Sequence, residues 1–161
     1  MVAILNRRLK LVSVGGTFDV MHKGHWILLE ECFKVGERVV VGLTTDEFVE
    51  EMKKSHPVDC YEKRLRELNR FLMERGLEKR TKIVPLMDPY GPTIESDEIE
   101  GIIVSEETEP VAEEINKLRV GRGKKPLLMI VITMVLAEDG KPITSTRIRR
   151  QEVDRYGRLL G

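Results

Sequence analysis

The chain has 161 residues, of which 41% are hydrophobic and 34% charged, and its 27 basic and 27 acidic residues give a formal net charge of zero. This length and composition predict one globular domain over residues 1–161, with a core of its own. The balanced charge argues against general binding to nucleic acid or to an acidic membrane, because both require a surplus of cations. The longest apolar run, Leu127–Leu136, is too short to cross a membrane. Cys32 and Cys60 form no paired framework, and the start of the chain lacks a signal-peptide pattern, so we expect a cytoplasmic location.

Short runs rich in Val and Ile alternate along the chain with stretches of helical periodicity. In chain order we predict a strand at Leu9–Val14, a helix at Trp26–Val35, a strand at Arg38–Leu43, helices at Asp46–Lys53 and Tyr61–Arg75, strands at Lys82–Met87 and Gly101–Val104, a helix at Glu109–Val120, a strand at Leu127–Val135 and a helix at Ser145–Leu160. The strands lack polar alternation, which suits strands covered on both faces. The order predicts an α/β fold with a doubly wound, parallel, five-stranded sheet, whose ligands bind at the carboxyl ends of the strands.

The segment Gly15–His25 follows the first predicted strand and leads into the first predicted helix. The start of a helix presents unpaired backbone N–H groups and partial positive charge, which suit a phosphate. His22 and His25 flank Gly24 and add two imidazole donors at the same place. Metal ligation is the alternative use of two imidazoles, but no cysteine or glutamate stands at ligand spacing beside them. The pattern indicates the handling of a nucleotide triphosphate.

A second cluster lies near the end of the chain, where Thr144, Ser145 and Thr146 are followed by Arg147 and Arg149. Hydroxyl residues at a helix start are ordinary N-caps, but they also donate to phosphates, and arginine binds phosphate well. The two roles are compatible, since one hydroxyl can cap while another meets a ligand. We expect this cluster and the first one to converge on a single polyphosphate.

Three further segments follow predicted strands. Lys53 and Lys54 are either a solvated surface pair or phosphate ligands, and His56 beside them is expected at the surface. The segment Ser105–Thr108 is either an acidic first helical turn or a wall of the nucleotide site. The loop Asp88–Thr93 is the clearest long loop of the chain.

The segments Gly16–Asp19 and His22–His25, together with Ile143–Arg149, resemble the H-x-G-H and I-S-S-T-x-I-R signatures of the nucleotidylyltransferase superfamily. Over its whole length the chain resembles the archaeal phosphopantetheine adenylyltransferases. Thr144 stands where that signature more often has Ser, and it keeps the hydroxyl. The resemblance implies a Rossmann-like fold and transfer of the adenylyl group of ATP to 4′-phosphopantetheine, which gives dephospho-coenzyme A and pyrophosphate. It also implies Mg²⁺ that arrives with ATP and is not held by a dedicated protein cage.

The resemblance further implies residue roles. Thr17 would orient the attacking phosphate, His22 and His25 would donate to the α- and β-phosphates, and Lys53 or Lys54 would bridge the nucleophile and the transition state. Ser145, Thr146 and Arg149 would hold the leaving pyrophosphate. The full ATP-binding set is Gly16, Thr17, Phe18, His22, Gly24, His25, Ser105, Glu107, Thr108, Ile143, Thr144, Ser145, Thr146 and Arg149. The substrate-binding set is Thr17, Asp19, Lys53, Lys54, Leu86, Met87 and Asp88, in which the last three are chosen only from their position after a strand.

Two other functions stay open from the sequence. One is cytidylyl or adenylyl transfer to another phosphate, such as glycerol phosphate, ethanolamine phosphate or FMN. The other is a non-catalytic nucleotide sensor, which the intact His22 and His25 argue against because a sensor has no transition state to stabilise. The sequence leaves the oligomeric state open and is compatible with a monomer.

Overall fold

The computed structural model describes residues 8–52 and 56–161. Within them, one sheet of parallel strands has the order β3-β2-β1-β4-β5. The strands are β1 (Leu9–Gly16), β2 (Gly36–Thr44), β3 (Thr81–Leu86), β4 (Gly101–Ser105) and β5 (Leu128–Ile132). The strand order reverses at β1, which pairs with β2 on one side and with β4 on the other. The predicted doubly wound, Rossmann-like sheet is therefore confirmed, and its switch point lies between β1 and β4.

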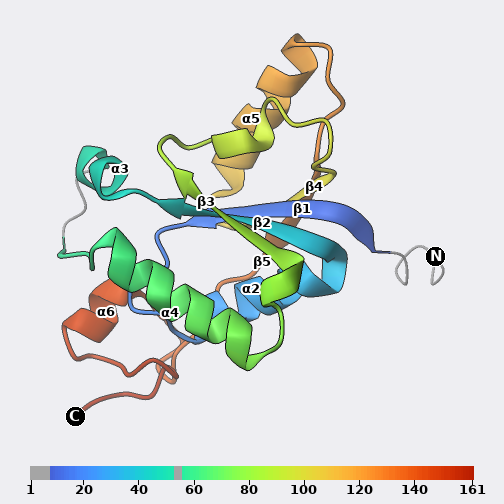
Figure 1. Cartoon of the computed structure of the whole chain (residues 1–161). Helices are drawn as coiled ribbons and strands as arrows, with labels where there is room; N and C mark the ends of the chain where they lie inside the picture. The colour runs from blue at the N-terminus through green and yellow to red at the C-terminus, as the bar shows by residue number, and fades with distance from the viewer. Residues whose placement is uncertain (1–7, 53–55) are drawn as a thin grey trace.

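Helices cover both faces of this sheet. They are α2 (Lys23–Val35), α3 (Asp46–Glu51), α4 (Tyr61–Glu74), α5 (Glu109–Gly121) and α6 (Ser145–Arg149), and two 3₁₀ turns span Glu78–Arg80 and Gly91–Thr93. Figure 1 shows α2 and α4 below the sheet and α5 above it. Among the described residues, no helix combines the length and the apolar character that crossing a bilayer requires.

The core has one hydrophobic layer on each face of the sheet. The layer under α2 and α4 contains Val12, Val14, Val39, Val41 and Leu43 from the strands and Leu29, Phe33, Leu68, Phe71 and Leu72 from the helices. The layer under α5 contains Ile102, Val104, Ala112 and Ile115. Burial of one such aliphatic side chain stabilises the fold by about 1.5–3 kcal/mol, so these layers fix the positions of the loops at the strand ends.

The last helix is much shorter than predicted. We expected it to span Ser145–Leu160, but α6 ends at Arg149, and Gln151 adopts a left-handed conformation with φ of 60°. Val153 is fully buried in a small third cluster, and the Asp154 carboxylate accepts two backbone N–H bonds in the following turn. Tertiary burial and local side-chain capping therefore override the helical pattern of this segment.

The boundaries of other elements also differ from the prediction, and two of these differences bear on the site. Helix α2 begins at Lys23 rather than at Trp26, because the imidazole of His22 caps it. Strand β5 ends at Ile132 rather than at Val135, and it is not covered on both faces: Leu128 is 57% exposed at this edge of the sheet. The three residues 133–135 instead turn towards the site described next.

Candidate active site

A cavity of about 570 Å³ lies over the carboxyl edge of the sheet. Each of the five strands contributes its last residue to the wall: Gly16, Thr44, Leu86, Ser105 and Ile132. A parallel sheet brings these strand ends to one edge, and the switch in strand order opens a crevice there. The cavity therefore occupies the place at which the fold class predicts a ligand.

The β1–α2 turn presents both histidines to this cavity. The Nδ1 atom of His22 accepts a hydrogen bond from the backbone N–H of Gly24 at 3.0 Å. The Nδ1 atom of His25 accepts one from the backbone N–H of His22 at 3.2 Å, so the two imidazoles form a reciprocal cap on α2. An imidazole that accepts at Nδ1 carries its hydrogen on Nε2. The cap thereby assigns the same tautomer to both rings, whose centroids are 3.9 Å apart.

His22 is electrically neutral in the folded protein. Burial and, to a smaller extent, the charge of Arg155 lower the pKa of its imidazole from 6.5 to about 4, while Asp19 acts in the opposite direction. At neutral pH the ring therefore offers an N–H donor without a formal charge. A neutral ring is also the form that its acceptor role at Nδ1 requires.

The backbone N–H groups at the start of α2 are more occupied than the sequence suggested. The N–H of Gly24 is bound by His22, and the N–H of Lys23 donates to the carbonyl of Arg155 at 2.9 Å. The first turn contains no acidic side chain that would repel an anion. These two backbone groups are therefore bound within the protein and are not the donors that suit a phosphate here.

The two sequence motifs meet at Asp19. The hydroxyl of Ser145 donates to the backbone carbonyl of Asp19 at 2.6 Å, across 126 positions of the chain. The guanidinium of Arg149 donates to both carboxylate oxygens of Asp19, at 2.9 and 3.1 Å, and to Asp59 at 3.1 Å. The predicted convergence of the two motifs in space is confirmed, and their binding of a single polyphosphate stays a prediction.

Arg149 itself does not line the cavity, although the sequence suggested that it binds phosphate. Asp19 is 2% exposed and lines the cavity, but both its carboxylate oxygens accept from Arg149, and one also accepts the N–H of Asp59. These ion pairs raise the pKa of Arg149 and satisfy its charge locally. The geometry makes Asp19 and Arg149 a clamp between the motifs.

The hydroxyls of Thr144 and Ser145 in the second motif have different hydrogen-bond partners. The side chain of Thr144 caps α6 by accepting the N–H of Arg147 at 3.1 Å, and Ser145 binds Asp19. Ile143, Thr144, Ser145 and Thr146 all line the cavity. Arg147 turns away and pairs with Asp139. The expected combination of capping and cavity-facing hydroxyls is thus present in one short segment.

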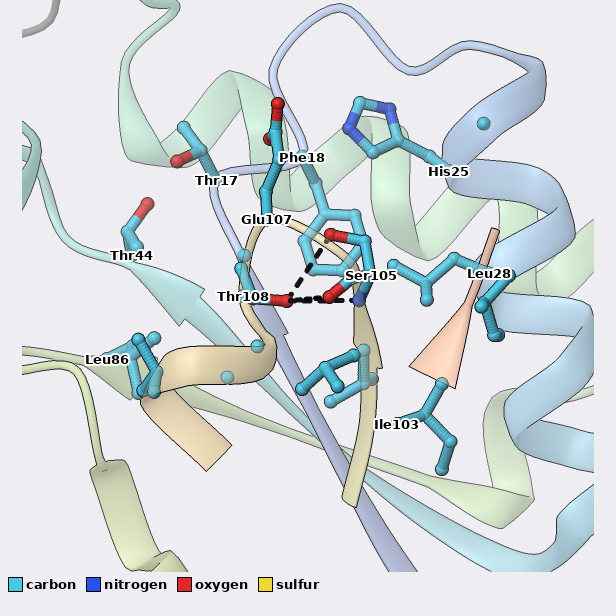
Figure 2. Close-up of a pocket in the computed structure, with 18 of the residues that line it drawn as sticks. Thr17, Phe18, His25, Leu28, Thr44, Leu86, Ile103, Ser105, Glu107 and Thr108 are labelled. Atoms are coloured by element: carbon cyan, nitrogen blue, oxygen red, sulfur yellow. Dashed lines mark hydrogen bonds between the residues drawn. The ribbon is translucent and has the colours of Figure 1, made fainter. Parts of the chain in front are cut away.

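The β4–α5 turn forms another wall. Ser105, Glu107 and Thr108 line the cavity, and Figure 2 shows them beside Thr17 and His25 of the β1–α2 turn. The Thr108 hydroxyl oxygen accepts the backbone N–H of Ser105 at 3.0 Å, which fixes the turn (Figure 2). Of the two interpretations of Ser105–Thr108, an acidic first helical turn or a wall of the site, the structure supports the wall.

The remaining predicted residues have mixed positions. Gly16, Thr17, Phe18, Gly24 and Leu86 line the cavity. Met87 is 69% exposed, and neither it nor Asp88 is on the cavity wall. The Asp88 carboxylate instead accepts the N–H groups of Tyr90 and Gly91 and shapes the loop after β3. Lys53 and Lys54 lie outside the described residues.

The structure also brings in residues that the sequence analysis did not select. Thr44, Phe48 and Met134 line the cavity, and so does His56, which we expected to be an isolated surface residue. All of them follow or end a strand at the carboxyl edge. Their position after a strand could have indicated these residues in the sequence. Their residue types are too common to identify a site unless the fold is known.

The comparisons with known proteins agree with this geometry. The sequence model of the cytidylyltransferase-like family matches residues 13–151, and the chain belongs to that family. It is 52% identical over 147 residues to the phosphopantetheine adenylyltransferase of Methanopyrus kandleri, which covers 91% of this chain and 92% of that protein. Its identity to the phosphopantetheine adenylyltransferase of Methanothermobacter thermautotrophicus is 46% over 156 residues, covering 97% and 93%. A crystal structure of a protein of unknown function from Archaeoglobus fulgidus has a TM-score of 0.68 at 30% identity, covering 77% of this chain and 89% of that one.

Proposed function

We propose that this chain transfers the adenylyl group of ATP to 4′-phosphopantetheine and releases dephospho-coenzyme A and pyrophosphate. The observation that carries the proposal is the junction of the two motifs at Asp19, beside one cavity that all five strand ends line. The archaeal relatives at 52% and 46% identity, which match nearly end to end, supply the choice of substrates.

The reaction requires no nucleophile from the protein. A phosphate oxygen of 4′-phosphopantetheine attacks the α-phosphorus of ATP in line and forms a new P–O bond. The bond between the α-phosphorus and the bridging oxygen breaks, and pyrophosphate leaves with the electron pair. A phosphate monoester is already nucleophilic at neutral pH, so the protein has to orient two anions and stabilise developing charge.

The β1–α2 turn is suited to that task. We assign Thr17 to the attacking phosphate, and the Nε2–H groups of His22 and His25 to the α- and β-phosphates. Their Nδ1 atoms are held by the helix cap, so these donors are oriented before the substrate arrives. Preorganised donors of this kind stabilise a transition state because they need no reorientation during the reaction.

The second motif is assigned to the leaving pyrophosphate. Thr146 and Ser145 line the cavity, and the Ser145 hydroxyl oxygen keeps acceptor capacity while its hydrogen is bound to Asp19. A contact between Arg149 and pyrophosphate would require its guanidinium to leave Asp19 or Asp59. A role in holding the two motifs together is therefore better supported for Arg149.

We assign Mg²⁺ to the nucleotide substrate. Residues 8–52 and 56–161 hold no group of three His, Cys, Asp or Glu side chains with metal-binding geometry. The carboxylate of Asp19 is already committed to Arg149, so the donor set fits a magnesium ion carried by the phosphates of ATP. A role for Lys53 or Lys54, a single domain over residues 1–161, a cytoplasmic location and a monomeric state stay predictions.

The test is a pyrophosphate-release assay with the purified full chain. ATP and CTP are each offered with 4′-phosphopantetheine, glycerol phosphate, ethanolamine phosphate and FMN, and the products are identified by mass spectrometry. We expect release only with ATP and 4′-phosphopantetheine, together with dephospho-coenzyme A. Turnover with CTP or with another acceptor would refute the assigned substrates, and nucleotide binding without turnover would indicate a sensor.

A further inference from the structure

Arg64 is a charged side chain buried behind the active-site wall. It lies on the first turns of α4, it is 0% exposed, and it is not among the residues that line the cavity. Removing a guanidinium from water is costly unless all its donors find partners. The hydrogen bonds of the buried Arg64 guanidinium therefore show which parts of the chain it holds in place.

The Arg64 guanidinium binds four residues from three separate segments of the chain. Its Nε–H donates to the carbonyl of Asp59 at 2.7 Å. One terminal nitrogen donates to the carbonyls of Thr17 at 3.0 Å and Thr44 at 2.8 Å, and to the Thr44 hydroxyl at 3.2 Å. The other terminal nitrogen donates to the carboxylate of Asp46 at 3.2 Å.

Two of these four partner residues belong to the cavity wall. Thr17 is in the β1–α2 turn, Thr44 ends β2, Asp46 begins α3, and Asp59 leads into α4. Thr17 and Thr44 line the cavity themselves. Asp59 also donates its N–H to Asp19 at 2.9 Å, so the same network continues to the junction of the two motifs.

We propose that Arg64 is a positioning residue for adenylyl transfer, which sets the location of Thr17 relative to the bound nucleotide without touching a substrate. The inference rests on the proposed function, because Thr17 is assigned there to the attacking phosphate. The planar guanidinium has five donors in a fixed fork, whereas an ammonium has three donors at a single point. A lysine at this position keeps the charge but cannot hold these three segments in one plane.

Arg64→Lys therefore separates geometry from charge. We expect kcat to fall about 100-fold, since a displacement near 1 Å in a positioned group has an effect of this size. The dissociation constant for ATP, measured by titration calorimetry, is expected to stay within about threefold, because the imidazole donors do not contact Arg64. General destabilisation would lower the molar ratio of bound ATP together with kcat, so a loss of kcat at an unchanged binding ratio separates positioning from unfolding.

Arg80 provides a matched control. It also binds three backbone carbonyls, those of Phe33, Gly36 and Glu37, at 2.8–3.0 Å. It precedes β3, at the amino edge of the sheet and away from the cavity. Arg80→Lys is expected to lower the melting temperature while kcat stays within about threefold, with all assays run well below the lower melting temperature.

A second pair of variants covers the case in which Arg64→Lys fails to fold. Asp46 is half-exposed and lies off the cavity wall, and it anchors one arm of the guanidinium. Asp46→Ala removes this acceptor and is expected to lower kcat about tenfold, whereas Asp46→Asn keeps an acceptor oxygen and is expected to restore kcat to within about twofold of the wild type.

The outcomes separate the two proposals. If the wild type makes no dephospho-coenzyme A, the proposed function fails. If the wild type is active, the inference is overturned by an Arg64→Lys enzyme with kcat within threefold of the wild type, or by Arg80→Lys lowering kcat equally. If Arg64→Lys does not fold, equal kcat values for Asp46→Ala and the wild type overturn it.

Discussion

Gly24→Ala is a substitution that tests the imidazole cap without removing either histidine. A β-carbon built at Gly24 lies 2.8 Å from Cε1 and 3.0 Å from Nδ1 of His22. Carbon atoms do not approach so closely, and His22 is 6% exposed, so its ring has little space to turn. The ring must move, and the hydrogen bond from the N–H of Gly24 to Nδ1 must weaken.

The size of the effect follows from this distance. Restoring ordinary contact requires a shift of the ring by roughly 0.6 Å. Because a 1 Å misplacement of a catalytic group lowers rates about 100-fold, we expect kcat to fall about 10- to 50-fold. The helix propensity gained by replacing glycine with alanine, about 1 kcal/mol, offsets the weakened cap, so the free energy of unfolding should change by less than about 1 kcal/mol.

Pyrophosphate release measures kcat, and urea denaturation measures stability. Gly121→Ala is the matched control, because Gly121 also lies in a helix but a β-carbon there meets no atom within 4 Å. We expect the control to keep full turnover. A Gly24→Ala enzyme with kcat within twofold of the wild type would refute the reasoning, because the Nε2–H donor would then not require the observed position of His22.

Three further predictions address the histidines and the clamp between the motifs. His25→Ala should lower kcat by about 10²–10³, the loss typical of one preorganised donor, and pyrophosphate release will show whether it does. The pKa of His22 is about 4 in the folded protein, whereas an ordinary imidazole has a pKa of 6.5, so the unfolded chain binds the extra proton first as the pH falls. The titration of His22 should therefore lower the free energy of unfolding of the wild type by about 2–3 kcal/mol between pH 7.5 and 4.5. In urea denaturation His22→Asn, which keeps a capping acceptor, should lose about 2–3 kcal/mol less than the wild type over this range. Identical pH profiles for the two proteins would contradict this sign. Asp19→Asn should lower the free energy of unfolding by about 3 kcal/mol, since it leaves Arg149 without its buried carboxylate. The control Asp97→Asn, at an exposed ion pair, should leave stability nearly unchanged. Equal melting temperatures of these two variants would argue against a clamp between the motifs.

The alternation of apolar runs and amphipathic stretches in the sequence was sufficient to predict the order of strands and helices. The two motifs could be found in the same way, because Gly24 between His22 and His25, and three consecutive hydroxyl residues, are unusual local patterns. Local patterns of this kind are readable since the strand period, the helix period and the capping preferences act over a few residues.

The roles inside each motif depended on contacts that the sequence does not record. Arg149 was expected at a phosphate, but it pairs with Asp19 and Asp59 from distant parts of the chain. Arg64 had no visible signal, because its importance comes from carbonyl groups, which every residue has.

The sequence by itself therefore determined the fold class, the location of both motifs and the chemistry that their side chains can perform. Only the tertiary structure decided where α6 ends, which hydroxyl caps α6 and which one binds Asp19, and which charges are already paired. The physical reason is that element type follows from short-range periodicity, whereas the partner of a donor or a charge depends on groups that the fold brings together across more than a hundred positions, as at Ser145 and Asp19.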